Sequence, residues 1–227
     1  MKKLAAFILS STLVLSLTAC SSDQQEQTGN GGADTSNTSD TAAQPALDGN
    51  ILIAYFSVPE TDGTDTVAGA SRVVVDGEVL GNNQYIAQLI QQEAGGDLFR
   101  IETVQEYPGT HDELLDFAYN ELSENARPEL ASQIENLDDY DVIFLGYPNW
   151  NADLPMPLYT FLEEYDFSGK TIIPFTAHGG SGFSGTIQTI QELQPEATVI
   201  EDGLEISRNS VPDAQSDVAD WVAGLKG

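Results

Sequence analysis

The 227-residue chain has one cysteine, two histidines and only eight lysines and arginines, against 36 aspartates and glutamates. A single cysteine cannot form an internal disulfide, and it excludes paired thiolate sites for catalysis or metal binding. The formal net charge of -28 leaves few groups to hold a phosphate backbone, so we expect no nucleic-acid binding. Such charge favours solubility, or faster encounter with a basic partner.

Residues 1–19 have the composition of a signal peptide. Lys2 and Lys3 precede an apolar run, 4–19, that is shorter than the ~20 apolar residues of a membrane span. The run ends in Leu17-Thr18-Ala19-Cys20, which resembles the lipobox of bacterial lipoproteins. The resemblance implies cleavage before Cys20 and lipidation of this residue, giving an extracytoplasmic protein held to a bacterial membrane by its lipid anchor only. The alternatives are a plain secretory signal with an incidental cysteine, and an uncleaved anchor.

The mature chain divides into a tether and one domain. Residues 20–49 are rich in Ser, Thr, Asn, Asp, Gln, Gly and Ala, and we expect a disordered tether behind the lipidated Cys20. As a random coil of ~30 residues, its mean reach is about 30 Å. Residues 50–227 suffice for one domain with a sizeable core, and they show neither a second linker nor an internal repeat. Loss of Lys2 and Lys3 would change the net charge from -28 to -30.

Apolar runs alternate with amphipathic stretches throughout the domain. Continuous runs predict strands buried on both faces at 51–57, 140–147 and 171–177, the last despite Pro174, and weaker patterns predict strands at 98–104 and 198–206. Helical spacing predicts helices that begin at Gly81-Asn82-Asn83 and over 110–122, 154–165, 187–193 and 212–225. A small hairpin is expected at 72–79, with Asp76-Gly77 as its turn. Strands alternating with helices predict an α/β fold of three layers around a parallel sheet.

Candidate ligand-binding residues lie in loops at the carboxyl ends of the predicted strands, where open α/β sheets bind ligands. Backbone N–H groups and hydroxyls at a helix start can hold a phosphate without Lys or Arg. Trp150 offers an aromatic face, and Gly179, Gly180 and Gly182 permit close backbone approach. Taken singly, these segments are also typical of a helix cap, of a core strand followed by a partly exposed tryptophan, and of a flexible turn.

Over residues 50–227 the pattern resembles the flavodoxin family, most closely the branch whose third strand ends Gly-Tyr-Pro-x-Trp and whose fourth runs into Gly-Gly-Ser-Gly. Here these motifs read Gly146-Tyr147-Pro148-Asn149-Trp150 and Gly179-Gly180-Ser181-Gly182, and 166–173 between them is also similar to the family. The resemblance implies a doubly wound, five-stranded parallel sheet of order 2-1-3-4-5, with FMN at the switch point between strands one and three. The FMN-binding residues that it implies are Ser57, Asn82, Asn83, Gln84, Pro148, Asn149, Trp150, Asn151, His178, Gly179, Gly180, Ser181 and Gly182.

The sequence departs from the family at three places. A long insertion separates Ser57, which matches the start of the family's phosphate loop, from Gly81-Asn82-Asn83, which matches its end. Asn83 stands where the family usually has Thr, and Asn151 stands where a second Trp is common. The first two departures bear on phosphate binding, and the third bears on flavin stacking.

The resemblance implies that FMN would carry the redox chemistry, and we predict neither a catalytic acid–base side chain nor a metal site. We hypothesise a low-potential electron carrier at the outer face of the membrane, because acidic surroundings disfavour an anionic reduced flavin. Its partner would be a redox protein or a small-molecule electron acceptor, and charge complementarity favours a basic one.

Two other functions stay open, and a third is disfavoured. An NAD(P)H-dependent FMN oxidoreductase would have to stack the nicotinamide directly on FMN, because the chain has no second nucleotide domain. A cofactor-free binding module on a flavodoxin fold is motivated by the three departures. A serine hydrolase is disfavoured because the chain has no Gly-x-Ser-x-Gly elbow. His178 could edge the flavin site, and His111 is expected at the surface where a helix begins.

Overall fold

The computed structural model describes residues 47–59, 61 and 72–226. The predicted signal peptide, Cys20 and nearly all of the predicted tether lie outside these residues. Along the described part of the chain, no helix is both long enough and apolar enough to cross a membrane.

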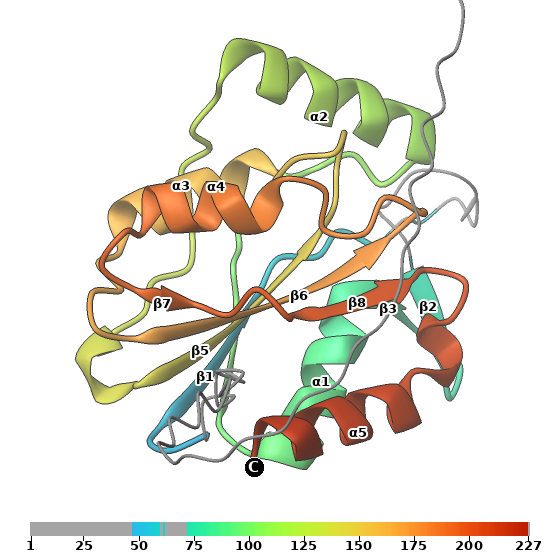
Figure 1. The fold of residues 1–227 in the computed structure, drawn as a ribbon. Helices are drawn as coiled ribbons and strands as arrows, with labels where there is room; N and C mark the ends of the chain where they lie inside the picture. Colours follow the sequence, from blue (N-terminus) through green and yellow to red (C-terminus); the bar gives the residue numbers. More distant parts are fainter. Residues whose placement is uncertain (1–46, 60, 62–71, 227) are drawn as a thin grey trace, which may run out of the picture. The chain divides into compact units, whose positions relative to one another are not determined.

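A parallel sheet forms the centre of the domain, with its strands in the order β4-β1-β5-β6-β7 and with β8 also paired to β6 (Figure 1). This is the predicted order 2-1-3-4-5, and the predicted α/β fold is confirmed. The strands are β1 (Ile51–Tyr55), β4 (Asp97–Arg100), β5 (Val142–Pro148), β6 (Thr171–His178), β7 (Thr198–Val199) and β8 (Leu204–Ser207). The helices are α1 (Asn82–Ala94), α2 (His111–Glu124), α3 (Met156–Glu164), α4 (Thr186–Leu193) and α5 (Gln215–Leu225), with 3-10 turns at Leu137–Asp139 and Val211–Asp213.

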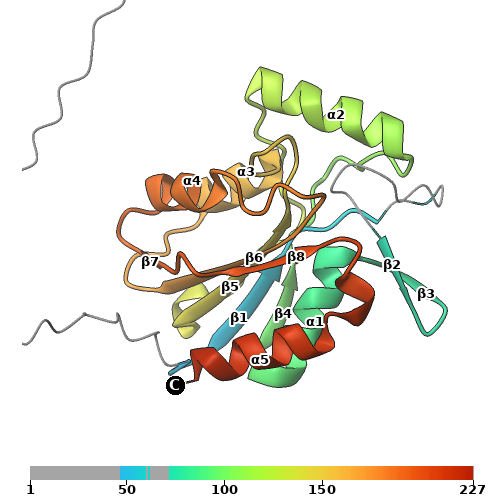
Figure 2. The ribbon, with the colours of Figure 1, turned by 45° about the vertical axis from the view of Figure 1, so that its right-hand side comes forward.

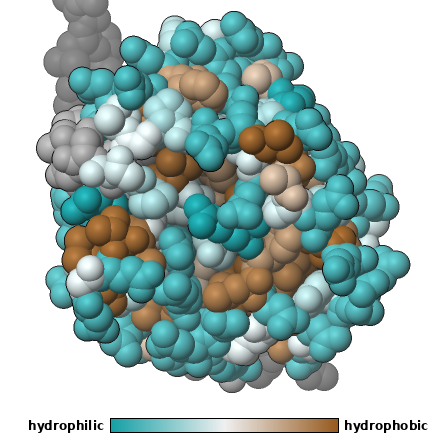
Figure 3. Space-filling view, turned by 180° about the vertical axis from the view of Figure 1, so that it is seen from behind, coloured by the Kyte–Doolittle hydropathy of each residue, from teal (hydrophilic) through white to brown (hydrophobic). Residues whose placement is uncertain are grey.

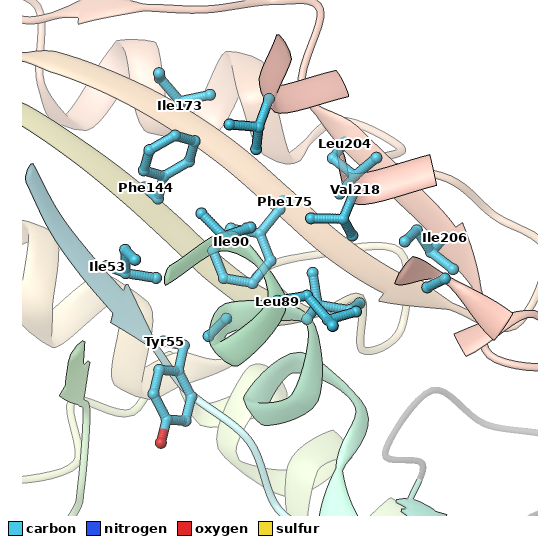
Figure 4. Packing of buried hydrophobic residues seen from close by; sticks show 14 of the residues in the cluster. Ile53, Tyr55, Leu89, Ile90, Phe144, Ile173, Phe175, Leu204, Ile206 and Val218 are labelled. Atoms are coloured by element: carbon cyan, nitrogen blue, oxygen red, sulfur yellow. The ribbon is translucent and has the colours of Figure 1, made fainter. Parts of the chain in front are cut away.

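Alternate residues of β1, β5 and β6 enter two separate cores, one on each face of the sheet. Helices cover both faces, which makes three layers (Figures 1 and 2). On one face, Ile53, Phe144 and Phe175 pack under α1 and α5 (Figure 4). On the other face, α2, α3 and α4 cover a second cluster that includes Leu52 and Leu145. Because both faces are covered, β1 and β5 are buried along their whole length, which explains their uninterrupted apolar sequences.

The predicted fifth strand at 198–206 is wrong as one element, because it is split into β7 and β8. Ile172 O accepts a hydrogen bond from Ile200 N, so even-numbered residues of β6 turn their backbone polar groups to this side. Pro174, which has no N–H to donate, therefore faces the break between β7 and β8. Gly203 lies in the break, where a Cβ would be 2.4 Å from Pro174 O.

The predicted hairpin is confirmed as β2 (Arg72–Val75) and β3 (Glu78–Gly81), an antiparallel pair outside the main sheet. Asp76 and Gly77 have φ values of 51° and 85°, the left-handed geometry that a two-residue hairpin turn requires. The predicted strand at 98–104 is shorter than expected: β4 ends at Arg100, and the chain then leaves the sheet.

Candidate functional site

Side-chain hydrogen bonds join the start of α1 to the end of β6, and the segment after β5 to the loop after β6, at the carboxyl edge of the sheet. Asn83, in the first turn of α1, accepts a hydrogen bond through Oδ1 from the backbone N–H of Ala177 at 2.9 Å. Asn149, after β5, donates from Nδ2 to Gly182 O at 2.6 Å and to Ser184 Oγ at 3.1 Å. The predicted site segments therefore converge, although they are far apart in sequence.

The start of α1 is a tight, polar and buried corner. Ser57 and Asn82 are 6% and 1% exposed. Ser57 approaches Gly81 so closely that a Cβ there would lie 2.0 Å from Ser57 Oγ, so any larger residue would have to displace the hydroxyl. Neither the amide oxygen nor the amide nitrogen of Asn82 has a hydrogen-bond partner within the described chain. An unpaired buried amide is costly, and a polar ligand group at this position would offset that cost.

The side chains of Gln84 and Asn83 bond to the protein backbone around the start of α1 and do not face a ligand. Gln84 Oε1 accepts the backbone N–H of Gly81 at 3.4 Å, which caps the start of α1. Asn83 is 1% exposed, and its oxygen satisfies an N–H at the end of β6. There the ladder opens because Thr176 Oγ1 donates to Tyr147 O at 2.7 Å. The asparagine in place of the family's threonine thus links α1 to β6.

The glycine-rich loop after β6 is held in shape by its neighbours. Gly180 and Gly182 have φ values of 130° and 56°, which favour glycine. His178 Nδ1 accepts the backbone N–H of Gly180 at 3.0 Å, which places the ring proton of a neutral His178 on Nε2. Glu205 Oε2, on β8, accepts Phe183 N–H at 3.3 Å. Gly179, Gly180 and Ser181 are exposed, so their backbone is accessible to a ligand.

Trp150 is 6% exposed, and its ring packs among aromatic side chains. Its centroid lies 5.5 Å from that of Phe56 and 5.7 Å from that of Tyr107. Its Nε1 is buried and has no acceptor in the described chain. Asn151 follows in an exposed left-handed turn with φ 55°, a conformation that asparagine tolerates and tryptophan does not favour.

A buried acid that was not predicted from the sequence lies beside this aromatic cluster. Tyr107 Oη donates to Glu121 Oε2 at 2.7 Å, and Gln105 Nε2 donates to Glu121 Oε1 at 2.5 Å. Burial raises the pKa of Glu121, although both hydrogen bonds act against the rise. Burial and the nearby carboxylate raise the pKa of Tyr107. Its position in the sequence could have indicated its burial. Glu121 follows the apolar Leu114 by seven residues, or two helical turns, so both side chains lie on the buried face of α2.

A cleft of about 470 Å³ opens beside Ser57 and Tyr107. It lies between the loops that follow β1 and β4, and its charged lining residues are Arg100, Glu102 and Glu106. His111, expected at the surface, is instead 7% exposed at the first residue of α2. Among the residues that the structure describes, no three His, Cys, Asp or Glu side chains are grouped as metal ligands.

The fold and this edge define a doubly wound α/β protein whose strand order reverses between β1 and β5, the position at which open sheets of this kind bind ligands. A flavodoxin family model matches residues 73–225, and the chain belongs to the flavodoxin family. A flavodoxin from Picosynechococcus sp. is 31% identical over 117 residues, which are 49% of this chain and 54% of that protein. The chain thus spans about half the length of that relative.

Solved structures agree with this fold. A Bacteroides uniformis protein assigned as a flavoprotein is 27% identical, with a TM-score of 0.60 over 77% of this chain and 98% of its own. A Lactobacillus acidophilus flavoprotein, crystallised in complex with FMN, is 20% identical, with a TM-score of 0.50 over 74% of this chain and 99% of its own. The second likeness concerns the fold alone.

Proposed function

We propose that this protein binds FMN at the joined loops and acts as an electron carrier. Membership of the flavodoxin family and the FMN complex of the Lactobacillus acidophilus neighbour support the cofactor. The observation that carries the proposal is the amide of Asn82, which is 1% exposed and has no partner for either polar atom in the described chain. A bound phosphate would supply an acceptor for its N–H group.

The start of α1 fits a phosphate without a cation. The first N–H groups of a helix have no intrahelical partner, and its dipole favours negative charge there. α1 is 13 residues long, has no acidic residue in its first turn, and begins beside the buried Ser57 hydroxyl. These donors hold a phosphate through directed hydrogen bonds, as helix N-termini do in other nucleotide-binding proteins.

The remaining residues would shape the flavin end of the site. FMN, when bound, supplies the redox chemistry. The backbone of the Gly179–Ser181 segment is exposed, and Asn149 fixes the loop that carries it. Trp150, which packs against Phe56 and Tyr107, would form the base of the site and keep water from it. The net charge of -28 disfavours added negative charge, which supports a low reduction potential.

Asn82→Ala tests the cofactor. Because the amide has no partner without ligand, we expect the apoprotein to remain as stable as the wild type or to become more stable. FMN affinity should fall roughly tenfold to a hundredfold, the value of a hydrogen bond to a charged group. Thr160→Val is the matched control, because Thr160 Oγ1, on α3, is also buried and has no hydrogen-bond partner among the described residues. Fluorescence titration with FMN gives affinity, and equal affinity in all three proteins would count against the site.

The carrier function has its own test. The holoprotein should exchange electrons with small redox mediators but consume NAD(P)H no faster than free FMN does. Steady NAD(P)H turnover would instead select a reductase. The reduction potential should rise with salt, because salt screens the net charge of -28. Hydrophilic residues cover much of the face drawn in Figure 3, where such screening acts. A reduction potential that does not change with salt would show that the net charge of the protein does not set it.

We also propose that the protein is anchored outside the cytoplasm through a lipid on Cys20, on the strength of the Leu17-Thr18-Ala19-Cys20 motif. Cys20→Ala should move the protein out of the membrane fraction, and mass spectrometry of the wild type should detect the lipid. An unmodified Cys20 in a membrane-bound protein would contradict lipidation.

A further inference from the structure

Beside the proposed flavin site, three buried or half-buried groups stand in an order that suits radical transfer. Trp150 contacts Tyr107, with ring centroids 5.7 Å apart and ring planes inclined by 53°. The phenol of Tyr107 donates a hydrogen bond to Glu121 Oε2, with 2.7 Å between the two oxygens. Glu121 is 7% exposed and accepts hydrogen bonds at both oxygens, as an ionised carboxylate does.

We propose that Trp150, Tyr107 and Glu121 form a proton-coupled electron relay, in which an oxidised Trp150 is reduced by Tyr107 while Glu121 takes the phenolic proton. The inference goes beyond the proposed carrier function, and it holds whether or not FMN is bound.

The step balances in electrons and protons. A one-electron oxidant, a class that includes photoexcited flavins and the azide radical, removes one electron from Trp150. Because Nε1 of Trp150 has no acceptor in the described chain, the indole keeps its proton and stays a radical cation. Tyr107 then gives one electron to Trp150 and its proton to Glu121 Oε2, leaving a closed-shell Trp150, a neutral tyrosyl radical and a neutral carboxylic acid.

The position of Tyr107 completes the route. Tyr107 lines the cleft of about 470 Å³, so a small one-electron donor from solvent can reach and restore it. Burial strengthens the coupling, because it raises the pKa of Glu121 and makes its carboxylate a better proton acceptor. The relay would carry an oxidising equivalent from the buried tryptophan to a solvent-accessible phenol.

The chain offers two matched controls. Trp221, the second tryptophan, has Phe144 as its aromatic neighbour, with centroids 5.6 Å apart. Tyr159 also pairs with a carboxylate, donating to Asp153 Oδ1 at 2.9 Å, and among the described ring contacts none joins it to Trp150. Among the residues that the structure describes, the contact with Trp150 and the hydrogen bond to a buried carboxylate thus occur together only at Tyr107.

Pulse radiolysis with azide radicals tests the relay in a Trp221→Phe background, where Trp150 is the only tryptophan. The tryptophanyl absorbance should decay as tyrosyl absorbance rises, at a rate independent of protein concentration. Adding Tyr107→Phe should abolish this rise, and adding Tyr159→Phe should leave it unchanged. Adding Glu121→Gln, which keeps a hydrogen-bond acceptor but removes the basic carboxylate, should slow the rise of tyrosyl absorbance on the order of a hundredfold.

Each other outcome overturns the proposal. Transfer that survives in Tyr107→Phe assigns it to another tyrosine, and an unchanged rate in Glu121→Gln removes the proton acceptor. If no Trp150 radical forms, the relay has no entry residue. Circular dichroism of each variant checks that loss of transfer does not reflect loss of fold.

Discussion

The side-chain oxygen of Asn83 accepts the backbone N–H of Ala177 at 2.9 Å, across 94 residues of sequence. The bond ties the start of α1 to the end of β6, where the backbone ladder opens. Two walls of the proposed flavin site are therefore joined by one buried amide.

Replacing Asn83 should separate its structural role from ligand binding. Asn83→Ala leaves the buried N–H of Ala177 unpaired and should cost about 1–3 kcal/mol in the free energy of unfolding. Asn83→Asp keeps an acceptor and suits the first turn of a helix, so it should fold nearly as stably. Its charge should weaken FMN binding more than about tenfold by repelling the phosphate. Urea unfolding and FMN titration measure the two effects, and equal stability of both variants would refute the tie.

Asn149→Asp should loosen the glycine-rich loop. The change removes the donor to Gly182 O and Ser184 Oγ and sets a carboxylate against a carbonyl. We expect faster amide hydrogen exchange over 179–184 and a stability cost of about 1–2 kcal/mol. Asn151→Asp makes the same chemical change in an exposed turn and should leave exchange unchanged. Similar exchange in both variants would contradict the prediction.

Two glycine-to-alanine substitutions should change the stability of the protein in opposite directions. A Cβ on Gly146, in β5, would lie 2.1 Å from the ring of Phe175, so Gly146→Ala overpacks the core and should cost ~1–3 kcal/mol. A Cβ on Gly224, in α5, meets nothing within 4 Å, so Gly224→Ala should stabilise the helix by about 0.5 kcal/mol. Thermal unfolding compares them, and a neutral Gly146→Ala would contradict the close packing.

Glu163 should contribute stability that is lost in acid. Arg127 binds it through two hydrogen bonds of 2.7 and 2.8 Å and lowers the pKa of Glu163 below its ordinary 4.5. A lowered folded-state pKa means that the contribution is present above pH 4.5 and disappears as the pH falls through the folded-state value. The pair is exposed, so the effect should be about 0.5 kcal/mol. Urea unfolding of Glu163→Gln should converge on the wild type as the pH falls.

Glu121 should show the opposite trend. Burial raises the pKa of Glu121 above its ordinary 4.5, so its favourable contribution is complete below pH 4.5 and is lost as the pH rises through the folded-state value. The stability of the wild type relative to Glu121→Gln should therefore decline with rising pH. Urea unfolding across this range measures the slope, and a slope of the same sign as for Glu163 would show that Glu121 is not held in a desolvating site.

Much of the fold could be predicted because it depends on local pattern. The sheet core shows as uninterrupted apolar sequence in β1 and β5, where both faces are covered. The loops of the site could be located because strand ends and helix starts carry local signals. The hairpin turn could be predicted in the same way, from the adjacent Asp76 and Gly77.

Other features depend on partners distant in sequence. The break in the last strand arises because Pro174, on the neighbouring strand, cannot donate to it. Trp150 packs inward because Phe56 and Tyr107 come from other loops. From the sequence, Asn83 is typical of a helix cap. Its hydrogen bond with Ala177 depends on a residue far along the chain and is seen only in the structure. Local residue patterns carry no record of such contacts.

The break between β7 and β8 also bears on how the protein behaves when concentrated. An exposed sheet edge can pair with the edge of another molecule, and long continuous edges are the most prone to such aggregation. Here one edge is divided into pieces of two and four residues, and the other, β4, has four residues that include the charged Asp97 and Arg100. Neither border offers a long uniform template, so Pro174 and Gly203 help to keep neighbouring molecules from joining sheet to sheet.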